Sequence, residues 1–180
     1  MIYLKEANLV DYEQEFIANN KIPYFENGFG NSYFGVSKFE FLDRSLPKMI
    51  EESKGINLGE GKVPQTIFYL WDDDVIVGMF KIRHYLNEGL RKAGGHIGYG
   101  IIEEYRNKGY GKEGLRLCIE KCKEIIKEDE IYLFAYKFNK ASLKVQVANG
   151  AYFVYEDDEI IHMRIKIWKQ MWWESLTKRK

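Results

Sequence analysis

The sequence predicts a mixed α/β fold with a mainly antiparallel sheet flanked by helices. Two segments rich in β-forming residues, 66–71 and 75–85, are separated only by three aspartates, which indicates an antiparallel hairpin. Residues 112–127 place apolar side chains along one face at helical spacing, which indicates an amphipathic helix. Strand-like and helix-like segments then alternate to residue 167. A chain of 180 residues is short enough to fold around one hydrophobic core, so we expect a single domain over residues 1–180.

The first sixty residues predict one strand and two helical regions. Residues 2–7 alternate weakly and indicate a strand, which a helix to about residue 20 follows. Residues 23–35 combine three glycines with five aromatic side chains, so we expect a loop. This loop is either held to the core by its rings or forms a mobile wall of a substrate pocket. Residues 37–53 predict a helix that is interrupted or restarted near Pro47.

The second half predicts the remaining strands and helices. Residues 87–95 are polar and end in two glycines, so we expect a loop there. The other expected elements are a strand at 96–102, the helix at 112–127, a buried strand at 131–136, a helix at 140–149, and closing strands at 152–155 and 160–167. The acidic run at 156–159 is expected to be the turn between the last two strands.

The charge balance argues against several classes of partner. Lys and Arg together number 27, and so do Asp and Glu, so the whole chain has no field that would attract nucleic acid or an anionic membrane. The first twenty residues lack an apolar run typical of a secretory signal, and no segment approaches the ~20 apolar residues that span a bilayer. We therefore expect a cytoplasmic protein with neither nucleic-acid nor membrane partners.

The cysteines and histidines indicate no metal site. Cys118 and Cys122 lie four residues apart in the helical pattern, where they share one face and behave as small buried hydrophobes of a reducing compartment. His84, His96 and His162 show no spacing typical of zinc ligands. We therefore expect no metal.

Residues 106–112, Arg-Asn-Lys-Gly-Tyr-Gly-Lys, join the strand at 96–102 to the helix and predict an anion-binding site. A helix N-terminus offers unpaired amides, and glycines allow phosphate oxygens to approach the backbone. Arg106, Lys108 and Lys112 add positive charge, which suits a pyrophosphate. Taken alone, the two glycines could equally serve a tight turn.

Two other phosphate motifs fit this stretch less well. A P-loop requires Ser or Thr after its lysine, and Glu113 stands there. Gly109, Gly111 and Gly114 do match the dinucleotide-binding spacing Gly-x-Gly-x-x-Gly. That motif normally opens an early βαβ unit and has an acidic residue after the next strand, whereas here the site follows a hairpin and that strand ends at Tyr136.

Arg-x-x-Gly-x-Gly after an apolar strand resembles the coenzyme A (CoA) signature of the GNAT superfamily of N-acetyltransferases. Asn139-Lys140-Ala141-Ser142 with Gly150-Ala151-Tyr152 resembles its second signature, at a fitting separation. The resemblance covers about residues 65–167, the expected CoA-binding core. Residues 83–99 are similar to a bacterial subgroup known mainly as predicted acetyltransferases.

The resemblance implies a single GNAT-like domain whose sheet is splayed where acetyl-CoA enters, and no metal. It also implies that strand amides hold the pantetheine arm and that the glycine segment holds the pyrophosphate. The residues expected to bind acetyl-CoA are Ile101, Ile102, Arg106, Lys108, Gly109, Tyr110, Gly111, Lys112, Asn139 and Ser142.

The catalytic positions of the family are not filled in the usual way. The family's base positions correspond to Gly95 and Ile97, and its general acid Tyr corresponds to Gln146, which cannot protonate a thiolate. His96 lies between the two base positions, so we expect His96, with Glu103 as a second candidate, to accept the proton or bind substrate. A structural role for His96 and a solvated turn for Glu103 are the alternatives.

The resemblance therefore implies an N-acetyltransferase that moves an acetyl group from acetyl-CoA to a primary amine of a small molecule or a peptide. A non-catalytic acyl-CoA binding or sensing module is the alternative, because the usual acid and base are absent. Residues 168–180 contain three tryptophans, and we expect this tail to pack on the core or to form a homodimer contact.

Overall fold

The computed structural model describes residues 1–167, so the expected packing or dimer contact of the 168–180 tail lies outside the described residues. In chain order the elements are β1 (Ile2–Glu6), α1 (Tyr12–Lys21), β2 (Phe25–Glu26), β3 (Phe29–Gly30), α2 (Lys38–Glu40), the π-helical turn η1 (Phe41–Ser45), α3 (Leu46–Ser53), β4 (Gln65–Asp72), β5 (Val75–Arg83), α4 (Glu88–Lys92), β6 (Ile97–Ile101), the 3-10 turn η2 (Glu103–Tyr105), α5 (Tyr110–Ile125), β7 (Glu130–Tyr136), α6 (Lys140–Ala148), β8 (Tyr152–Glu156) and β9 (Ile160–Lys166).

The strands form two antiparallel sheets and one short hairpin. The larger sheet has the order β1-β4-β5-β6, the smaller has the order β7-β9-β8, and β2 pairs with β3. The predicted hairpin of β4 and β5 is confirmed, with Phe68 opposite Phe80 and with Asp73 at a φ of 50° in its turn. The mixed α/β fold with a mainly antiparallel sheet is therefore confirmed.

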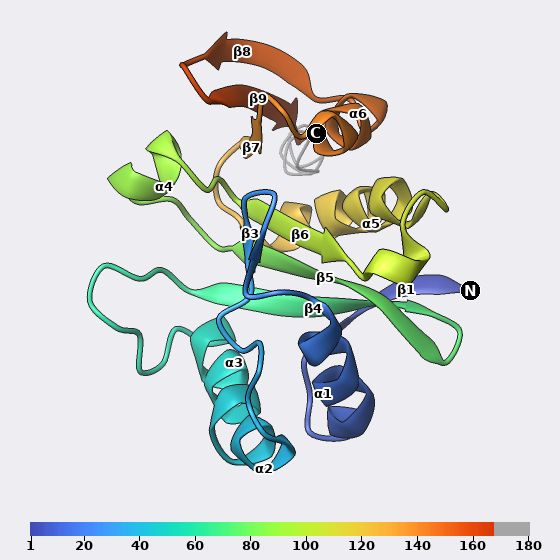
Figure 1. Ribbon diagram of the computed structural model, residues 1–180. Helices are drawn as coiled ribbons and strands as arrows, with labels where there is room; N and C mark the ends of the chain where they lie inside the picture. Colours follow the sequence, from blue (N-terminus) through green and yellow to red (C-terminus); the bar gives the residue numbers. More distant parts are fainter. Residues whose placement is uncertain (168–180) are drawn as a thin grey trace, which may run out of the picture.

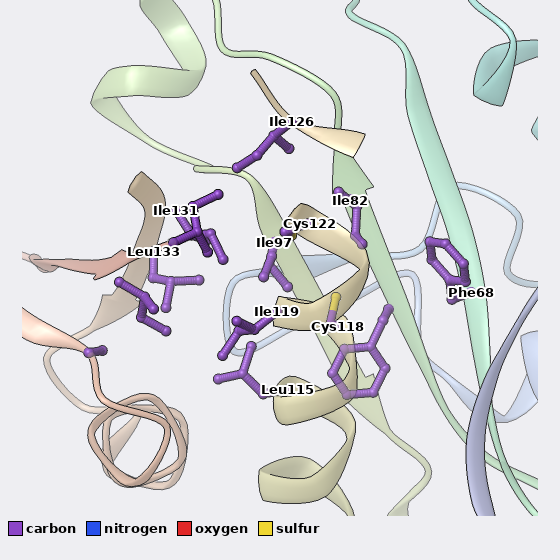
Figure 2. Close-up of a cluster of buried hydrophobic side chains, with 14 of the residues drawn as sticks. Phe68, Ile82, Ile97, Leu115, Cys118, Ile119, Cys122, Ile126, Ile131 and Leu133 are labelled. Carbon is purple, nitrogen blue, oxygen red and sulfur yellow. The ribbon is translucent and has the colours of Figure 1, made fainter. Parts of the chain in front are cut away.

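Helices cover both faces of the larger sheet (Figure 1). Successive residues of a strand point to opposite faces, so β4 contributes to two cores. Phe68 and Leu70 pack with α5, whereas Ile67 and Tyr69 pack with α1, η1 and α3. Figure 2 shows the first core, in which one face of α5 lies between the larger sheet and β7.

The apolar stripe of α5 explains its glycine and its cysteines. Cys118 and Cys122 are buried and free, as expected. A Cβ atom on Gly114 would lie 2.3 Å from Cζ of Phe80, so only glycine allows the helix to approach β5 this closely. Helix packing therefore accounts for the third glycine of the dinucleotide-like spacing.

The two sheets meet where β6 and β7 begin. The His96 amide donates to the Tyr132 carbonyl at 2.8 Å, and the Tyr132 amide donates to Nδ1 of His96 at 2.9 Å. Gly95 has a φ of +62°, and a Cβ atom there would lie 2.3 Å from the Tyr132 oxygen. Beyond this joint β6 and β7 belong to different sheets, and a cavity separates them.

Two expected loops contain short elements instead. The 23–35 segment forms β2 and β3, and the 87–95 segment contains α4, whose start is capped by Asn87 accepting from the Leu90 amide at 2.9 Å. Helical structure continues from α2 through η1 into α3, with Pro47 tolerated in the first turn of α3. Among the described residues no helix is both long and apolar enough to cross a membrane.

Candidate active site

A cavity of about 820 Å³ lies between β6 and β7. Its walls are β6, the end of β7, the first turn of α5, the first half of α6 and the β2–β3 hairpin. The hairpin lies against β6 in Figure 1, and the ring of Phe29 packs where Gly98 and Gly100 leave that face of β6 without side chains. The cavity therefore has a strand, two helix starts and a hairpin around it.

The start of α5 forms one end of the cavity. Asn107 and Gly109 have φ values of 61° and 89°, which turn the chain so that α5 begins at Tyr110. The first amides of a helix have no partner within it, and here Gly109 to Lys112 line the cavity. Free amides, the positive end of the helix dipole and the Lys112 ammonium together favour an anion.

Arg106 lines the same cavity, but its charge already has a partner. Its Nε donates to the Ile101 carbonyl at 3.0 Å, its Nη1 lies 3.1 Å from Oε1 of Glu26, and its Nη2 contacts the other oxygen of that carboxylate. The guanidinium thereby connects the β2–β3 hairpin to the end of β6. An anion at this site would compete with Glu26 for Arg106.

Two residues of the expected acetyl-CoA set lie away from the cavity. Ile102 is buried in the core beneath α1, and its amide donates to the Val77 carbonyl at 3.0 Å. Lys108 is exposed, with Nζ 5.6 Å from the centre of the Tyr105 ring. The structure brings the other expected residues to one cavity: Ile101, Arg106, Gly109, Tyr110, Gly111, Lys112, Asn139 and Ser142.

The start of α6 closes the cavity on the side opposite β6. Asn139 caps this helix by accepting from the Ser142 amide at 3.0 Å, and its Nδ2 donates to the Asn27 carbonyl at 3.1 Å. The Asn139 side-chain amide, which the second signature would offer to the pantetheine arm, is therefore bonded to the tip of the hairpin.

Tyr99 is a polar cavity residue that the sequence analysis did not select. Its hydroxyl lies 2.9 Å from Oγ of Ser142, which also accepts from Nε2 of Gln146 at 3.2 Å. Burial raises the pKa of Tyr99 to about 12, so the phenol stays protonated at neutral pH. Gln146 occupies the family's acid position and is buried, while Tyr99 presents a proton donor from the facing strand.

His96 lies outside the cavity, and its position argues against the expected role of proton acceptor. The ring is fully buried, Nδ1 accepts from the Tyr132 amide at 2.9 Å, and Nε2 lies 3.5 Å from Oε2 of Glu128. Burial lowers its pKa to about 4. Glu103 is exposed in η2 and does not line the cavity either. His96 instead fixes β6 to β7.

Two cations of β5, the buried Lys81 and the half-buried Arg83, form the other end of the cavity, and neither was predicted from the sequence. Nζ of Lys81 donates to the Gly30 carbonyl at 2.6 Å and lies 5.1 Å from the centre of the Phe29 ring. Burial, together with the charge of Arg83, lowers the pKa of Lys81 to about 8. Their signal in the sequence was the placement of charged residues within an otherwise apolar strand, β5.

Metal ligands are not gathered anywhere in the described part of the chain, where no three His, Cys, Asp or Glu side chains could hold an ion together.

The model of the acetyltransferase (GNAT) family matches residues 32–151. No curated protein matches the sequence significantly. The match includes both segments that line the cavity from β6 to α6.

Solved structures share the fold at low sequence identity. A probable acetyltransferase has a TM-score of 0.64 and 19% identity, with 92% of each chain covered. Spermidine N-acetyltransferase from Vibrio cholerae, solved with CoA and spermine, has a TM-score of 0.60 and 15% identity over 92% of this chain and 95% of that one. The ribosomal L7/L12 α-N-protein acetyltransferase RimL, solved with CoA, has a TM-score of 0.64 and 12% identity over 92% and 94%.

Proposed function

The chain belongs to the acetyltransferase (GNAT) family, and we propose that it transfers the acetyl group of acetyl-CoA to a primary amine. One observation carries the proposal. The free amides at the start of α5 open into the end of a cavity that continues between β6 and β7. A cradle for phosphate next to a long cleft suits a donor that has a pyrophosphate at one end of its arm and a thioester at the other.

We assign the pyrophosphate to the first turn of α5, with Lys112 beside it. The arm would then follow β6 past Ile101, because β6 is an edge strand of its sheet within residues 1–167 and can offer backbone hydrogen bonds there. Asn139 would exchange its bond to the Asn27 carbonyl for one to the arm. The residues that support this assignment all line one cavity.

The reaction needs two reactants held together, one proton removed from the amine nitrogen and one proton given to the leaving thiolate. The amine nitrogen attacks the thioester carbonyl carbon, the amide bond forms, and the carbon–sulfur bond breaks. The leaving thiolate gains a proton, which we assign to the Tyr99 phenol because it lines the cavity and stays protonated at neutral pH. The proton that the amine loses passes to water.

Release of free thiol tests the proposal. Purified protein is mixed with acetyl-CoA and a panel of primary amines that includes amino acids, polyamines, simple alkylamines and peptides with a free N-terminus. We expect thiol release that depends on the amine and matches the amount of N-acetyl product. If CoA binds tightly but no amine produces thiol, the chain is a non-catalytic acyl-CoA binding module and the proposal fails.

A further inference from the structure

We propose that the acceptor is an amine that also carries an anionic group, and that Lys81 and Arg83 bind this group. The inference rests on the proposed function and adds the substrate class. Three features of the cavity support it: the position of the two cations, the absence of a carboxylate beside them within residues 1–167, and the charges of the other lining residues.

Lys81 and Arg83 lie on the same face of β5, two residues apart, and both line the cavity. Gly78 of β5 pairs with Ile101, next to the phosphate end, whereas Lys81 pairs with Gly98. At about 3.3 Å per residue, the two cations lie roughly 10 and 17 Å along the strand from Gly78. They therefore occupy the opposite end of the cavity from the first turn of α5.

Among residues 1–167, neither cation has a carboxylate partner. Lys81 is only 6% exposed, and within the described residues no carboxylate oxygen lies within 4.0 Å of its Nζ or of the Arg83 guanidinium. The acidic group that acts on Lys81 from further away is Glu52, whose carboxylate accepts from Gln65 at 2.8 Å and lies 3.5 Å from Nζ of Lys62. Burying the Lys81 ammonium without a counter-ion is unfavourable, so an anionic ligand would complete this end of the cavity.

The local contacts of the two cations leave donors unused. Nζ of Lys81 carries three hydrogens, and one of them binds the Gly30 carbonyl. Arg83 uses Nη1 for the carbonyls of Gly94 and Gly95, at 3.1 and 2.9 Å. Within the described part of the chain, its Nε and Nη2 have no hydrogen-bond acceptor. An ammonium and a guanidinium edge are the pair of donors that a carboxylate or a phosphate binds well.

The remaining charges of the cavity disfavour a polycationic acceptor. Among the described lining residues the single carboxylate is Glu26, and Arg106 already pairs with it. Lys112 and Lys144 lie near the start of α5 and the face of α6, where the phosphates of the donor would bind. The cations at the other end then remain for the acceptor. A polyamine would bring positive charge against Lys81 and Arg83, which is repulsive.

The test compares amine acceptors that carry a negatively charged group with counterparts that lack it. β-Alanine is measured against β-alaninamide and propylamine, aminoethyl phosphate against ethanolamine, and spermidine serves as the polycationic acceptor. We expect kcat/KM for an anionic amine to exceed that of its neutral counterpart by at least tenfold. The carboxylate and phosphate pairs identify which anion is preferred, and either preference supports the inference.

The variants Lys81→Met and Arg83→Gln locate the effect. Each should reduce the preference for the anionic amine at least tenfold by raising its KM, while KM for acetyl-CoA stays unchanged. Lys48→Met, on the exposed face of α3, is the matched control and should keep the wild-type preference. Because Arg83 also holds the Gly94–Gly95 loop, thermal unfolding is measured for each variant, and Lys81→Met decides the outcome if Arg83→Gln unfolds.

Three results would overturn the inference while the proposed function stands. The first is thiol release with no preference for anionic amines, or with a preference for spermidine. The second is an equal loss of kcat for every amine in Lys81→Met, which would identify Lys81 as a proton acceptor. The third is a tenfold rise in KM for acetyl-CoA, which would place the two cations at the donor. Absence of thiol release with every amine would instead contradict the proposed function itself.

Discussion

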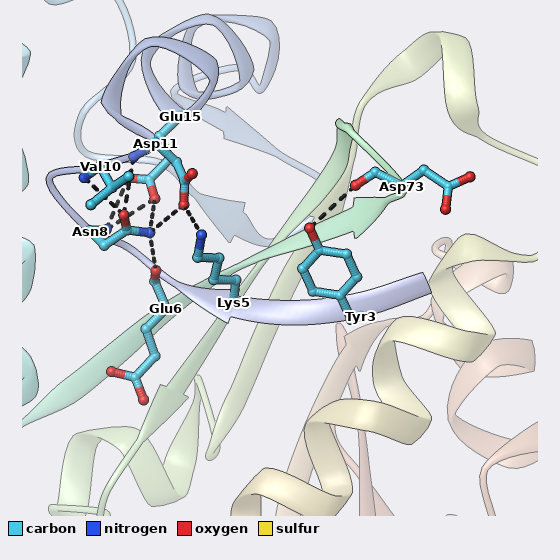
Figure 3. A network of polar contacts seen from close by, with 8 residues as sticks. All are labelled: Tyr3, Lys5, Glu6, Asn8, Val10, Asp11, Glu15 and Asp73. Atoms are coloured by element: carbon cyan, nitrogen blue, oxygen red, sulfur yellow. Dashed lines mark hydrogen bonds and ion pairs between the residues drawn. The ribbon is translucent and has the colours of Figure 1, made fainter. Parts of the chain in front are cut away.

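Glu15 at the start of α1 is a buried carboxyl group held by its neighbours in the chain (Figure 3). Its Oε1 accepts from the backbone amide and the side-chain amide of Asn8, both at 3.0 Å, and the side chain is fully buried. Burial raises its pKa to about 8. At pH values above this, the folded protein must bury a carboxylate.

We predict that Glu15→Gln stabilises the fold at alkaline pH. A raised folded-state pKa gives stability that is fully present below the unfolded value of 4.5 and lost as pH rises through about 8. Gln keeps most of the hydrogen bonds but does not ionise, so the free energy of unfolding should exceed wild type by about 2 kcal/mol at pH 9 and differ little at pH 4.5. Urea unfolding at both pH values measures this, with the exposed Glu13→Gln as control.

Tyr99→Phe is predicted to lower the rate of acetyl transfer without weakening donor binding. Phe keeps the stacking of this ring on Phe80, whose centroid lies 5.3 Å away, and removes only the hydroxyl beside Ser142. Loss of a general acid typically costs about 10²-fold or more in kcat. Steady-state kinetics and calorimetry with CoA measure the two effects, and the exposed Tyr85→Phe should change neither. An unchanged kcat would remove Tyr99 from the mechanism.

At the scale of elements, the sequence predicted best where local pattern and tertiary environment agree. The β-forming run of β4 and β5 and the apolar stripe of α5 each identify their element without reference to the rest of the chain. The helix start after the glycine segment at 106–112 is also found as predicted, because a helix start after a strand is a local feature. These elements supply the sheet and the end of the cavity formed by the first turn of α5.

Elements that are stabilised by contacts between distant parts of the chain could not be predicted from local sequence pattern. Each strand of the β2–β3 hairpin has only two residues. The hairpin is held in place by the packing of Phe29 against β6 and by the ion pair between Glu26 and Arg106. Arg106 is eighty positions from Glu26, so no local pattern indicates the pair. The role of Lys81 is hidden for the same reason, because its contact is the Gly30 carbonyl of the hairpin.

The hairpin leads to a prediction about donor affinity. In Glu26→Gln the carboxylate that pairs with Arg106 becomes neutral, so the guanidinium is available to a phosphate and a negative charge leaves the cavity. We expect CoA to bind at least about threefold more tightly, which corresponds to ~0.7 kcal/mol. Isothermal calorimetry measures the change. Glu104→Gln, which removes an exposed ion pair with Lys21 outside the cavity, should leave affinity unchanged. Weaker binding would mean that the hairpin must stay closed on Arg106.

At the scale of the whole molecule, the cavity exists because two sheets meet at one end only. The joint is a single region, formed by the backbone bond from His96 to Tyr132, the His96 ring and Gly95. His96 was expected to take part in the chemistry, because its neighbours occupy catalytic positions in the family. Its actual partners lie thirty-six residues away on β7, and only the folded chain brings them together.

We predict that Gly95→Ala both destabilises the protein and weakens donor binding. Gly95 and Gly61 have similar positive φ values, +62° and +71°, so an alanine at either costs about 1 to 2 kcal/mol in backbone strain. At Gly61 nothing lies within 4 Å of the added Cβ, whereas at Gly95 the atom would lie 2.3 Å from the Tyr132 carbonyl oxygen. The difference between the two variants therefore isolates the joint between the sheets.

Urea unfolding should give Gly95→Ala at least about 2 kcal/mol less stability than Gly61→Ala. CoA should bind it at least tenfold more weakly, because the cleft between β6 and β7 depends on this joint. Equal stability and equal affinity in the two variants would show that α5 alone sets the distance between the sheets.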